Sequence, residues 1–229
     1  MSRLARSQTG TEILDDPGAD PRAVGLSLEN IARSNRWFGG LAAVRYGLER
    51  LLAGLRGRIT LLDIGTGKGD IPLWARRWAG SRDLELFPIG LDRHPVAARL
   101  AARHGVSTIL GCGGDLPVRS RGVDIVVVSQ VAHHLDPTSC VTLFHECNRV
   151  ARVGVVLADL RRSRPAAAGF WIGSRLLGFD PVTRADGLTS LRRGFTAAEL
   201  AALLRQSGIE TPVVRRPGAR LVAAWRTGR

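Results

Sequence analysis

The sequence contains no run of 18 apolar residues, so it lacks a segment suited to a membrane-spanning helix. Its first 16 residues also lack the apolar core of a secretory signal, which predicts a cytoplasmic protein. The three cysteines, Cys112, Cys140 and Cys147, are too few for a disulfide framework. Apolar residues make up 45% of the 229 residues and charged residues 23%, as is typical of a packed globular protein. This composition excludes a disordered chain, a collagen and a coiled coil.

Lysine and tyrosine are almost absent, with one residue of each beside 32 arginines. The formal net charge is +13, and the chain from Arg161 onward holds 13 basic and four acidic residues, a net charge of +9. Such a C-terminal third suits an anionic partner, either nucleic acid, a membrane surface or an acidic ligand. A GC-rich genome also produces an excess of arginine over lysine. Aromatic residues, on which bases stack, make up only 5%, so nucleic acid is the less favoured partner.

The chain divides into three parts. Residues 1–21 are rich in Ser, Gly, Asp and Pro, and we expect a flexible N-terminal tail. Residues 22–56 predict a helical cap of two helices, 22–37 and 40–54, because their apolar residues recur at helical spacing. In residues 57–229, the core, short apolar runs alternate with helices, which predicts βαβ units and a parallel sheet covered on both faces. The predicted strands span 59–64, 86–91, 107–110, 123–129 and 153–159, and the predicted helices begin near residues 70, 95 and 138.

The C-terminal part of the core departs from this alternation. Residues 161–195 form an insertion of irregular pattern, which includes an apolar stretch with three glycines at Pro165–Phe179. A capping box then opens a predicted helix over 197–206. Two short strands, around 210–214 and 219–225, predict an antiparallel hairpin on the edge of the sheet.

The strongest local signal is the glycine loop after the first predicted strand, Asp63-Ile-Gly-Thr-Gly-Lys-Gly-Asp70. Its glycines permit a sharp turn and a close approach to a ligand, and the following helix N-terminus offers free N–H groups. A P-loop would need Ser or Thr after Lys68, and a dinucleotide-binding loop would need glycine in place of Asp70. An acid two residues before the first glycine instead suits a ligand with a positive amino group. A tight strand-to-helix turn without a ligand is the alternative.

Three further loops carry polar side chains at the ends of predicted strands. Asp92 ends the second strand, where an acid can accept both hydroxyls of a ribose. After the third strand, Asp115 can accept from an adenine amino group and Leu116 can pack on the ring. Ser129 and Gln130 end the fourth strand. All of these loops lie at the carboxyl ends of parallel strands, where open α/β sheets bind their ligands.

Together the four loops resemble the class I S-adenosylmethionine-dependent methyltransferases, above all over residues 57–160 and in the group of small-molecule enzymes of quinone and polyketide pathways (methyltransferase type 11). The resemblance implies an α/β, Rossmann-like three-layer αβα methyltransferase fold, with a seven-stranded sheet that has one antiparallel strand. It implies S-adenosyl-L-methionine as cofactor, with the N-terminal helices and residues 161–195 covering the substrate side. Carried over position by position, it implies cofactor contacts from Asp63, Gly65, Thr66, Gly67, Asp92, Arg93, Gly114, Asp115, Leu116, Ser129 and Gln130.

His133 and His134 follow the fourth strand at the mouth of this site and are the candidate catalytic residues. Methyl transfer to a hydroxyl or a carbon acid needs the loss of a proton, which histidine accepts near neutral pH. Adjacent residues point in different directions, so we expect one of the two to face the acceptor; a purely structural role is the alternative. The cysteines lack the spacing of metal ligands, and no metal site is predicted.

The expected acceptor is a lipophilic phenol, quinol or polyketide-like ring, with methylation of oxygen slightly favoured over carbon. This expectation depends on Pro165–Phe179, whose apolar residues beside arginines suit a greasy acceptor with a polar or anionic end, and also contact with a membrane surface. An RNA methyltransferase or RNA-binding protein that uses the basic C-terminal third is the alternative. The candidate acceptor-binding residues are Trp37, Phe38, Asp159, Arg161 and Trp171.

Overall fold

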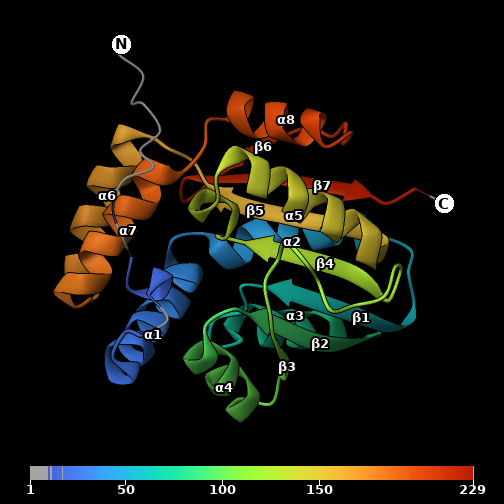
Figure 1. Ribbon diagram of the computed structural model, residues 1–229, viewed down its shortest axis with the longest axis horizontal. Helices are drawn as coiled ribbons and strands as arrows, with labels where there is room; N and C mark the ends of the chain where they lie inside the picture. Colours follow the sequence, from blue (N-terminus) through green and yellow to red (C-terminus); the bar gives the residue numbers. More distant parts are fainter. Residues whose placement is uncertain (1–9, 11, 17, 229) are drawn as a thin grey trace.

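The computed structural model describes residues 10, 12–16 and 18–228. It contains a seven-stranded sheet of order β3-β2-β1-β4-β5-β7-β6 (Figure 1). Only β7 runs antiparallel to its neighbours, so the predicted sheet and its antiparallel edge hairpin are confirmed. The strands are β1 (Gly57–Ile64), β2 (Leu84–Asp92), β3 (Ser107–Leu110), β4 (Val123–Ser129), β5 (Ala151–Leu160), β6 (Val214–Arg216) and β7 (Arg220–Arg226).

Helices cover both faces of the sheet, which gives the predicted three-layer arrangement. Apolar residues of α2 and α3 pack on one face, and those of α5 and α8 pack on the other. The helices are α1 (Pro21–Trp37), α2 (Gly40–Leu52), α3 (Asp70–Gly80), α4 (Pro95–Arg103), α5 (Pro137–Val150), α6 (Arg164–Leu176), α7 (Pro181–Arg193) and α8 (Ala197–Gln206). Across the described residues, no helix combines the length and the apolarity that a membrane span requires.

The centre of the sheet is the part that positions a site. Every residue of β4 is buried, as its continuous apolar sequence requires of a strand covered on both faces. The strands β1 and β4 are parallel neighbours at the centre of the sheet. From β1 the sheet continues through β2 to β3 on one side, and from β4 it continues to β5 on the other. Such a reversal opens a crevice at the carboxyl ends of the strands, where α/β proteins bind ligands.

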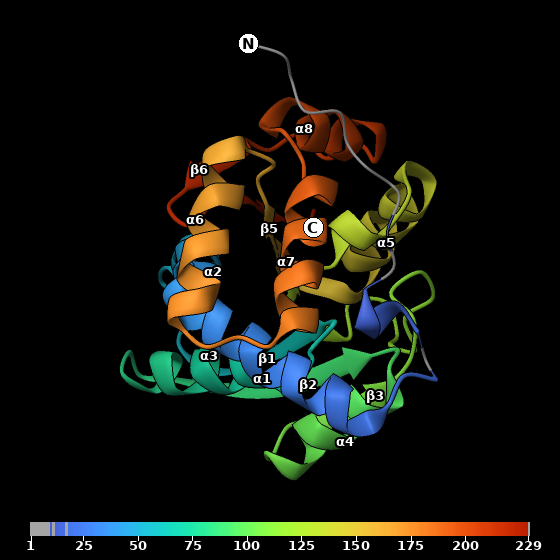
Figure 2. The same ribbon diagram turned by 90° about the vertical axis from the view of Figure 1, so that its left-hand side faces the viewer.

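Three helices stand beyond those carboxyl ends. Figure 1 shows α1, α6 and α7 on the side to which β1, β4 and β5 point, and Figure 2 shows α6 and α7 side by side. The insertion predicted at 161–195 therefore forms a helical pair. Its second helix, α7, begins at the N-cap Asp180, whose side chain accepts from the N–H groups of Val182 and Thr183.

The chain before α1 differs from the flexible tail predicted for residues 1–21, of which residues 1–9, 11 and 17 lie outside the described residues. Residues 12–16, which include a short 3-10 turn at Ile13–Asp15, lie against α7; we call them the N-terminal strap. Glu12 is buried and accepts from the hydroxyl of Ser190 at 2.8 Å. The amide of Ile13 donates to Asp186 at 3.1 Å. Buried polar contacts with α7, which is distant in the sequence, hold this segment in place. Such contacts cannot be recognised from composition.

Candidate active site

A cavity of about 450 Å³ lies where the carboxyl ends of the strands meet α1, α6, α7 and the N-terminal strap. Its lining joins two different surfaces. Polar loops from β1, β2 and β4 form one end, and apolar side chains of the helices form the other. Of the residues predicted from the sequence, the cavity is lined by Phe38, Gly65, Thr66, Gly67, Asp92, Arg93, Ser129, Gln130, His133 and His134.

The glycine loop turns tightly from β1 into α3. Gly65, Gly67 and Gly69 all have positive φ angles, of 71°, 56° and 83°, a conformation that glycine adopts without strain. The N–H groups of Gly65 and Thr66 donate to the carbonyl of Leu91 at 2.8 and 3.0 Å, which fixes the loop to β2. A Cβ atom at Gly65 would overlap the side chain of Val131. The loop therefore needs glycine both for its backbone and for its packing.

Asp63 precedes this loop as a buried carboxylate, and its two oxygens have no hydrogen-bond partner in good geometry. Burial raises the pKa of Asp63 well above its ordinary value, and the nearby Thr66 hydroxyl offsets part of that shift. The hydroxyl of Ser129, at the end of the adjacent β4, is likewise buried without a partner. Unpaired acceptors of this kind fit a ligand that brings its own cationic donor, such as the amino group of S-adenosylmethionine.

Asp92 ends β2 at the cavity wall. Its carboxylate accepts from the N–H of Gly67 and from the N–H of His94, both at 2.9 Å. Burial raises the pKa of Asp92, and these two backbone hydrogen bonds oppose the shift. The side chain thus ties the glycine loop to the start of α4. The neighbouring Arg93 points to the N-terminal strap, where its guanidinium donates to Asp15 at 2.9 Å.

The loop after β3 lines the cavity with residues that precede the predicted ones. Gly111, Cys112 and Gly113 line the cavity, whereas Gly114, Asp115 and Leu116 do not. Leu116 is 2% exposed and belongs to the apolar core under α5, so its side chain is unavailable to a ligand. Its N–H group donates to Glu146 at 2.8 Å. The backbone of the three preceding residues forms this wall instead.

Gln130 has an unusual backbone at the end of β4, with a φ angle of 58° in a residue other than glycine. Its amide nitrogen donates to the Asn35 side chain of α1 at 2.5 Å, and Asn35 in turn donates to Asp70 at 3.0 Å. This chain of hydrogen bonds joins β4, α1 and the first turn of α3 around the cavity. Asn35 was not singled out in the sequence because nothing in its local pattern marks it.

His133 and Asp159 form a buried pair. His133 lies in the turn after β4, and Asp159 lies near the end of β5. These strands are neighbours, and Ser129 at the end of β4 pairs with Ala158, the residue before Asp159. His133 Nδ1 is 2.7 Å from Asp159 Oδ1. His133 Nε2 is buried without a partner, and His133 lines the cavity. Burial raises the pKa of Asp159, but the adjacent His133 outweighs it, and the net pKa lies below the ordinary value.

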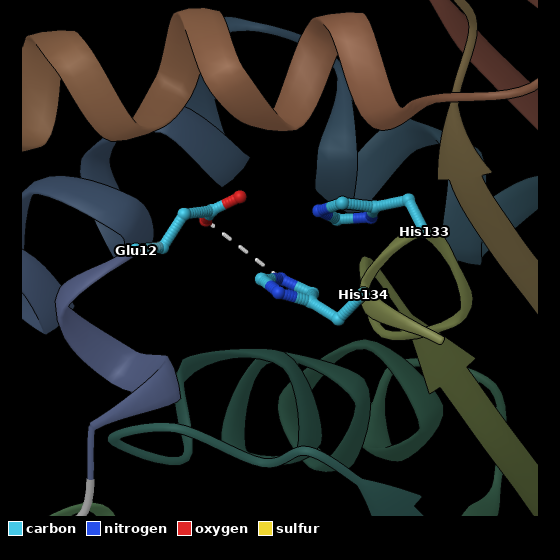
Figure 3. Close-up of side chains that lie close together, drawn as sticks. All are labelled: Glu12, His133 and His134. Atoms are coloured by element: carbon cyan, nitrogen blue, oxygen red, sulfur yellow. Dashed lines mark ion pairs between the residues drawn. The ribbon is translucent and has the colours of Figure 1, made fainter. Parts of the chain in front are cut away.

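His134 faces the N-terminal strap instead. Figure 3 shows Glu12 and His134 turned toward each other, with Glu12 Oε2 3.8 Å from His134 Nε2. His134 Nδ1 lies 3.2 Å from Asp15 and 3.3 Å from the Arg193 guanidinium. That guanidinium also contacts Glu12 at 3.2 Å and Asp15 at 3.0 Å. The two histidines have different hydrogen-bond partners, but their ring centroids lie 4.2 Å apart and both line the cavity, whereas the sequence predicted that only one would face the acceptor.

Glu12, His133 and His134 offer ligand atoms within 4.8 Å of one another, close enough for a metal ion. Arg193 already places a positive charge against Glu12 and Asp15. A cation bound between Glu12 and the histidines would be repelled by that guanidinium. The arrangement therefore favours an ion-pair network over a metal centre.

The apolar end of the cavity is built around three phenylalanines. The Phe38 and Phe170 ring centroids are 5.6 Å apart, and those of Phe170 and Phe179 are 6.4 Å apart. Phe170 packs over Gly187 of α7, where a Cβ atom would overlap its ring. Sequence analysis missed Phe170 and Phe179, although both lie within the apolar stretch that it selected. They give the cavity an aromatic wall.

Three other predicted acceptor residues lie away from the cavity. Trp37 is 64% exposed and Trp171 is 49% exposed, each with an arginine stacked over its ring. Both side chains sit on the outer surface of their helices, because the register of each helix turns a neighbouring phenylalanine inward. Arg161 does not line the cavity either, and its N–H donates to the carbonyl of Ala219 at 2.7 Å.

Comparison with known proteins agrees with this geometry. Residues 62–158 match the methyltransferase domain family. No curated protein is similar in sequence. A SAM-dependent methyltransferase from Aquifex aeolicus has a TM-score of 0.63 at 15% identity, over 91% of this chain and 99% of that one. Human N-acetylserotonin methyltransferase in complex with SAM has a TM-score of 0.60 at 13% identity, over 91% and 57%. Magnesium protoporphyrin IX methyltransferase from Synechocystis with bound SAH has a TM-score of 0.55 at 14% identity, over 83% of each chain.

The sheet order, the glycine loop and the unpaired acceptors of Asp63 and Ser129 all fit one cofactor, S-adenosylmethionine. The sequence match over residues 62–158 covers the strands and loops that build this end of the cavity. Over residues 62–158 the chain matches the methyltransferase domain family, and its fold is the one found in S-adenosylmethionine-dependent methyltransferases.

Proposed function

We propose that the protein methylates a hydroxyl group of a lipophilic aromatic small molecule, of the phenol, quinol or polyketide type. The observation that carries this proposal is the buried His133–Asp159 pair, whose free Nε2 atom meets a cavity with an apolar aromatic wall. Two of the structural neighbours are named for small-molecule acceptors, N-acetylserotonin and magnesium protoporphyrin IX. Those names support a small molecule, and the histidine can accept the proton that a hydroxyl has to lose.

The cofactor would be held at the polar end of the cavity. The residues proposed to hold it are Asp92 toward its ribose and the backbone of the Gly65–Gly67 loop, which line the cavity, and Asp63 toward its amino group, which is buried beside the loop and does not itself line the cavity. When bound, S-adenosylmethionine supplies a methyl group on a sulfonium, an electrophile that needs a nucleophile aligned with it. The chain's main contribution is to hold the acceptor oxygen in that line.

His133 would act as general base. Its Nδ1–H donates to Asp159, which leaves the Nε2 lone pair toward the cavity and stabilises the imidazolium that forms. Nε2 takes the proton of the acceptor hydroxyl, and the acceptor oxygen becomes the nucleophile. Proton transfer of this kind accelerates a reaction by about 10²–10⁴-fold.

The test is a methyl-transfer assay with labelled S-adenosylmethionine, in which the protein is offered an organic-soluble metabolite extract or total RNA. Label in an organic-soluble product, lost in Asp63→Asn and strongly reduced in His133→Asn, is the expected result. Label in RNA alone would overturn the proposal and assign the basic C-terminal third to nucleic acid. His134→Asn serves as the matched control, since that side chain contacts the N-terminal strap.

A further inference from the structure

A second buried charge meets the cavity at its apolar end. Arg220, the first residue of β7, is 2% exposed and lines the cavity. Its Nε–H donates to the carbonyl of Phe38 at 3.1 Å, which fixes the guanidinium. The Nη1 nitrogen is buried and has no hydrogen-bond partner. Among the described residues, none places a carboxylate oxygen within ion-pair distance of Arg220.

An unpaired buried guanidinium is costly to a fold, because both its charge and its N–H groups lose water without compensation. Burial lowers the pKa of Arg220 to about 10, and the charge of Asp159 opposes that shift. The side chain is therefore cationic at neutral pH. Its donors form a fork that matches an oxygen anion.

The surroundings of Arg220 distinguish the two ends of the cavity. β7 pairs with β5 so that Arg220 stands opposite Leu160, the residue after Asp159. Arg220 donates to the carbonyl of Phe38, whose ring lies 5.6 Å from that of Phe170, so it stands at the aromatic end of the cavity.

We propose that Arg220 binds an oxygen anion of the acceptor, such as a carboxylate, carried on the same ring system as the hydroxyl that is methylated. The proposal rests on the proposed function, since it assigns His133 to the hydroxyl and Arg220 to a second group of one molecule. The acceptor class is then an acidic hydroxyaryl compound. An apolar wall with one fixed cation selects such a molecule over a neutral phenol, because the neutral compound leaves the guanidinium unpaired.

The competing occupant is the carboxylate of the cofactor itself. Binding of S-adenosylhomocysteine, which keeps that carboxylate, separates the two assignments. Arg220→Met preserves the length of the side chain and removes its charge, and Arg220→Lys restores the charge without the fork. Both variants retain an aliphatic chain against Phe38 and Leu160.

The experiment measures equilibrium binding of 1-hydroxy-2-naphthoate and of 1-naphthol to the full-length protein saturated with S-adenosylhomocysteine. We expect the carboxylate to strengthen binding to the wild-type protein by about 10–100-fold, the range of a charge-assisted hydrogen bond. In Arg220→Met this ratio falls to about one, and Arg220→Lys recovers part of it. The affinity for S-adenosylhomocysteine stays within about threefold in all three proteins.

Equal binding of the two naphthalenes to the wild-type protein overturns the inference, and that comparison depends on no variant. A loss of S-adenosylhomocysteine affinity in a folded Arg220→Met protein also overturns it and assigns Arg220 to the cofactor. Binding of neither compound overturns the acidic hydroxyaryl class. None of these outcomes removes the proposed function, which fails only if no small-molecule hydroxyl is methylated in the assay described above.

Discussion

His133 Nδ1 and Asp159 Oδ1 lie 2.7 Å apart, and solvent reaches neither side chain. The pair exists because two parallel strands, β4 and β5, end side by side: Asp159 lies near the end of β5, and His133 lies in the 3-10 turn after β4. A carboxylate in this position fixes the orientation of the imidazole and its tautomer. The remaining nitrogen has no hydrogen-bond partner and belongs to a residue that lines the cavity, which is why we propose it as the acceptor of the hydroxyl proton.

Replacing His133 with Asn should lower kcat by about 10²–10⁴-fold, because the base is removed while the glycine loop and Asp63 stay in place. The measurement is steady-state methyl transfer together with calorimetric binding of S-adenosylhomocysteine. The affinity for S-adenosylhomocysteine should not change. In His134→Asn, kcat should fall far less. An equal loss in the two variants would show that the turn, and not the His133 base, had been damaged.

Asp63→Asn should stabilise the protein without cofactor and abolish cofactor binding. Folding raises the pKa of Asp63, so this carboxyl group opposes folding at any pH above its unfolded pKa, and the cost shrinks as the pH falls below the folded pKa. We expect the variant to be more stable at pH 7.5, because a neutral amide costs less to bury than a carboxylate. The gain over wild type should shrink at lower pH.

Thermal unfolding without cofactor between pH 5 and pH 8 tests this expectation. Asp92→Asn is the matched control, since both oxygens of Asp92 accept from backbone N–H groups and an amide satisfies only one of them. That variant should lose stability where Asp63→Asn gains it. Destabilisation of both variants by similar amounts would contradict the interpretation of Asp63 as an unpaired ligand of the cofactor.

The sequence predicted the elements whose pattern is local. The bounds of β3, β4 and α8 agree with the predicted ranges residue for residue, since continuous apolar runs and a capping box mark them. It did not predict α7, because that helix has few apolar residues and depends on contacts with the N-terminal strap and with Phe170.

The site could be predicted only in part, for a related reason. Residues at strand ends converge whatever the details of packing, so Asp92 and Ser129 reach the cavity as predicted. On a helix, neighbouring side chains differ in direction by about 100°. The predicted Phe38 lines the cavity, whereas the predicted Trp37 and Trp171 are exposed and Phe170, the neighbour of Trp171, points inward instead. Arg220 comes from the edge hairpin, and no motif connects it with His133.

Gly169→Leu should block the acceptor and spare the cofactor. Gly169 is exposed and also lines the cavity, so it lies at the cavity's rim; a Cβ atom there meets nothing within 4 Å, and a leucine would narrow the way in for the acceptor. We expect KM for the acceptor to rise by about tenfold or more, from lost contacts equivalent to about 1.4 kcal/mol. S-adenosylhomocysteine should bind unchanged.

Gly25→Leu is the control for this substitution. Gly25 also lies within a helix, α1, with open space at its Cβ position, and it does not line the cavity. Leucine has a higher helix propensity than glycine, so both variants should be at least as stable as the wild type. A weaker cofactor affinity in Gly169→Leu would place the cofactor, and not the acceptor, beside α6.

Chelation should leave methyl transfer unchanged, because the Arg193 guanidinium supplies the positive charge between Glu12 and Asp15. The same geometry predicts that Arg193→Met creates a cation site. Removing the guanidinium takes away the buried positive charge that Glu12 and Asp15 share, which should cost about 3–5 kcal/mol of stability. Zinc should then raise the melting temperature of Arg193→Met and have no such effect on the wild type.

The measurement is thermal unfolding with EDTA or with zinc, alongside activity after exhaustive dialysis against EDTA. Loss of wild-type activity after dialysis, restored by a divalent ion, would show that Glu12, His133 and His134 hold a metal despite the neighbouring arginine.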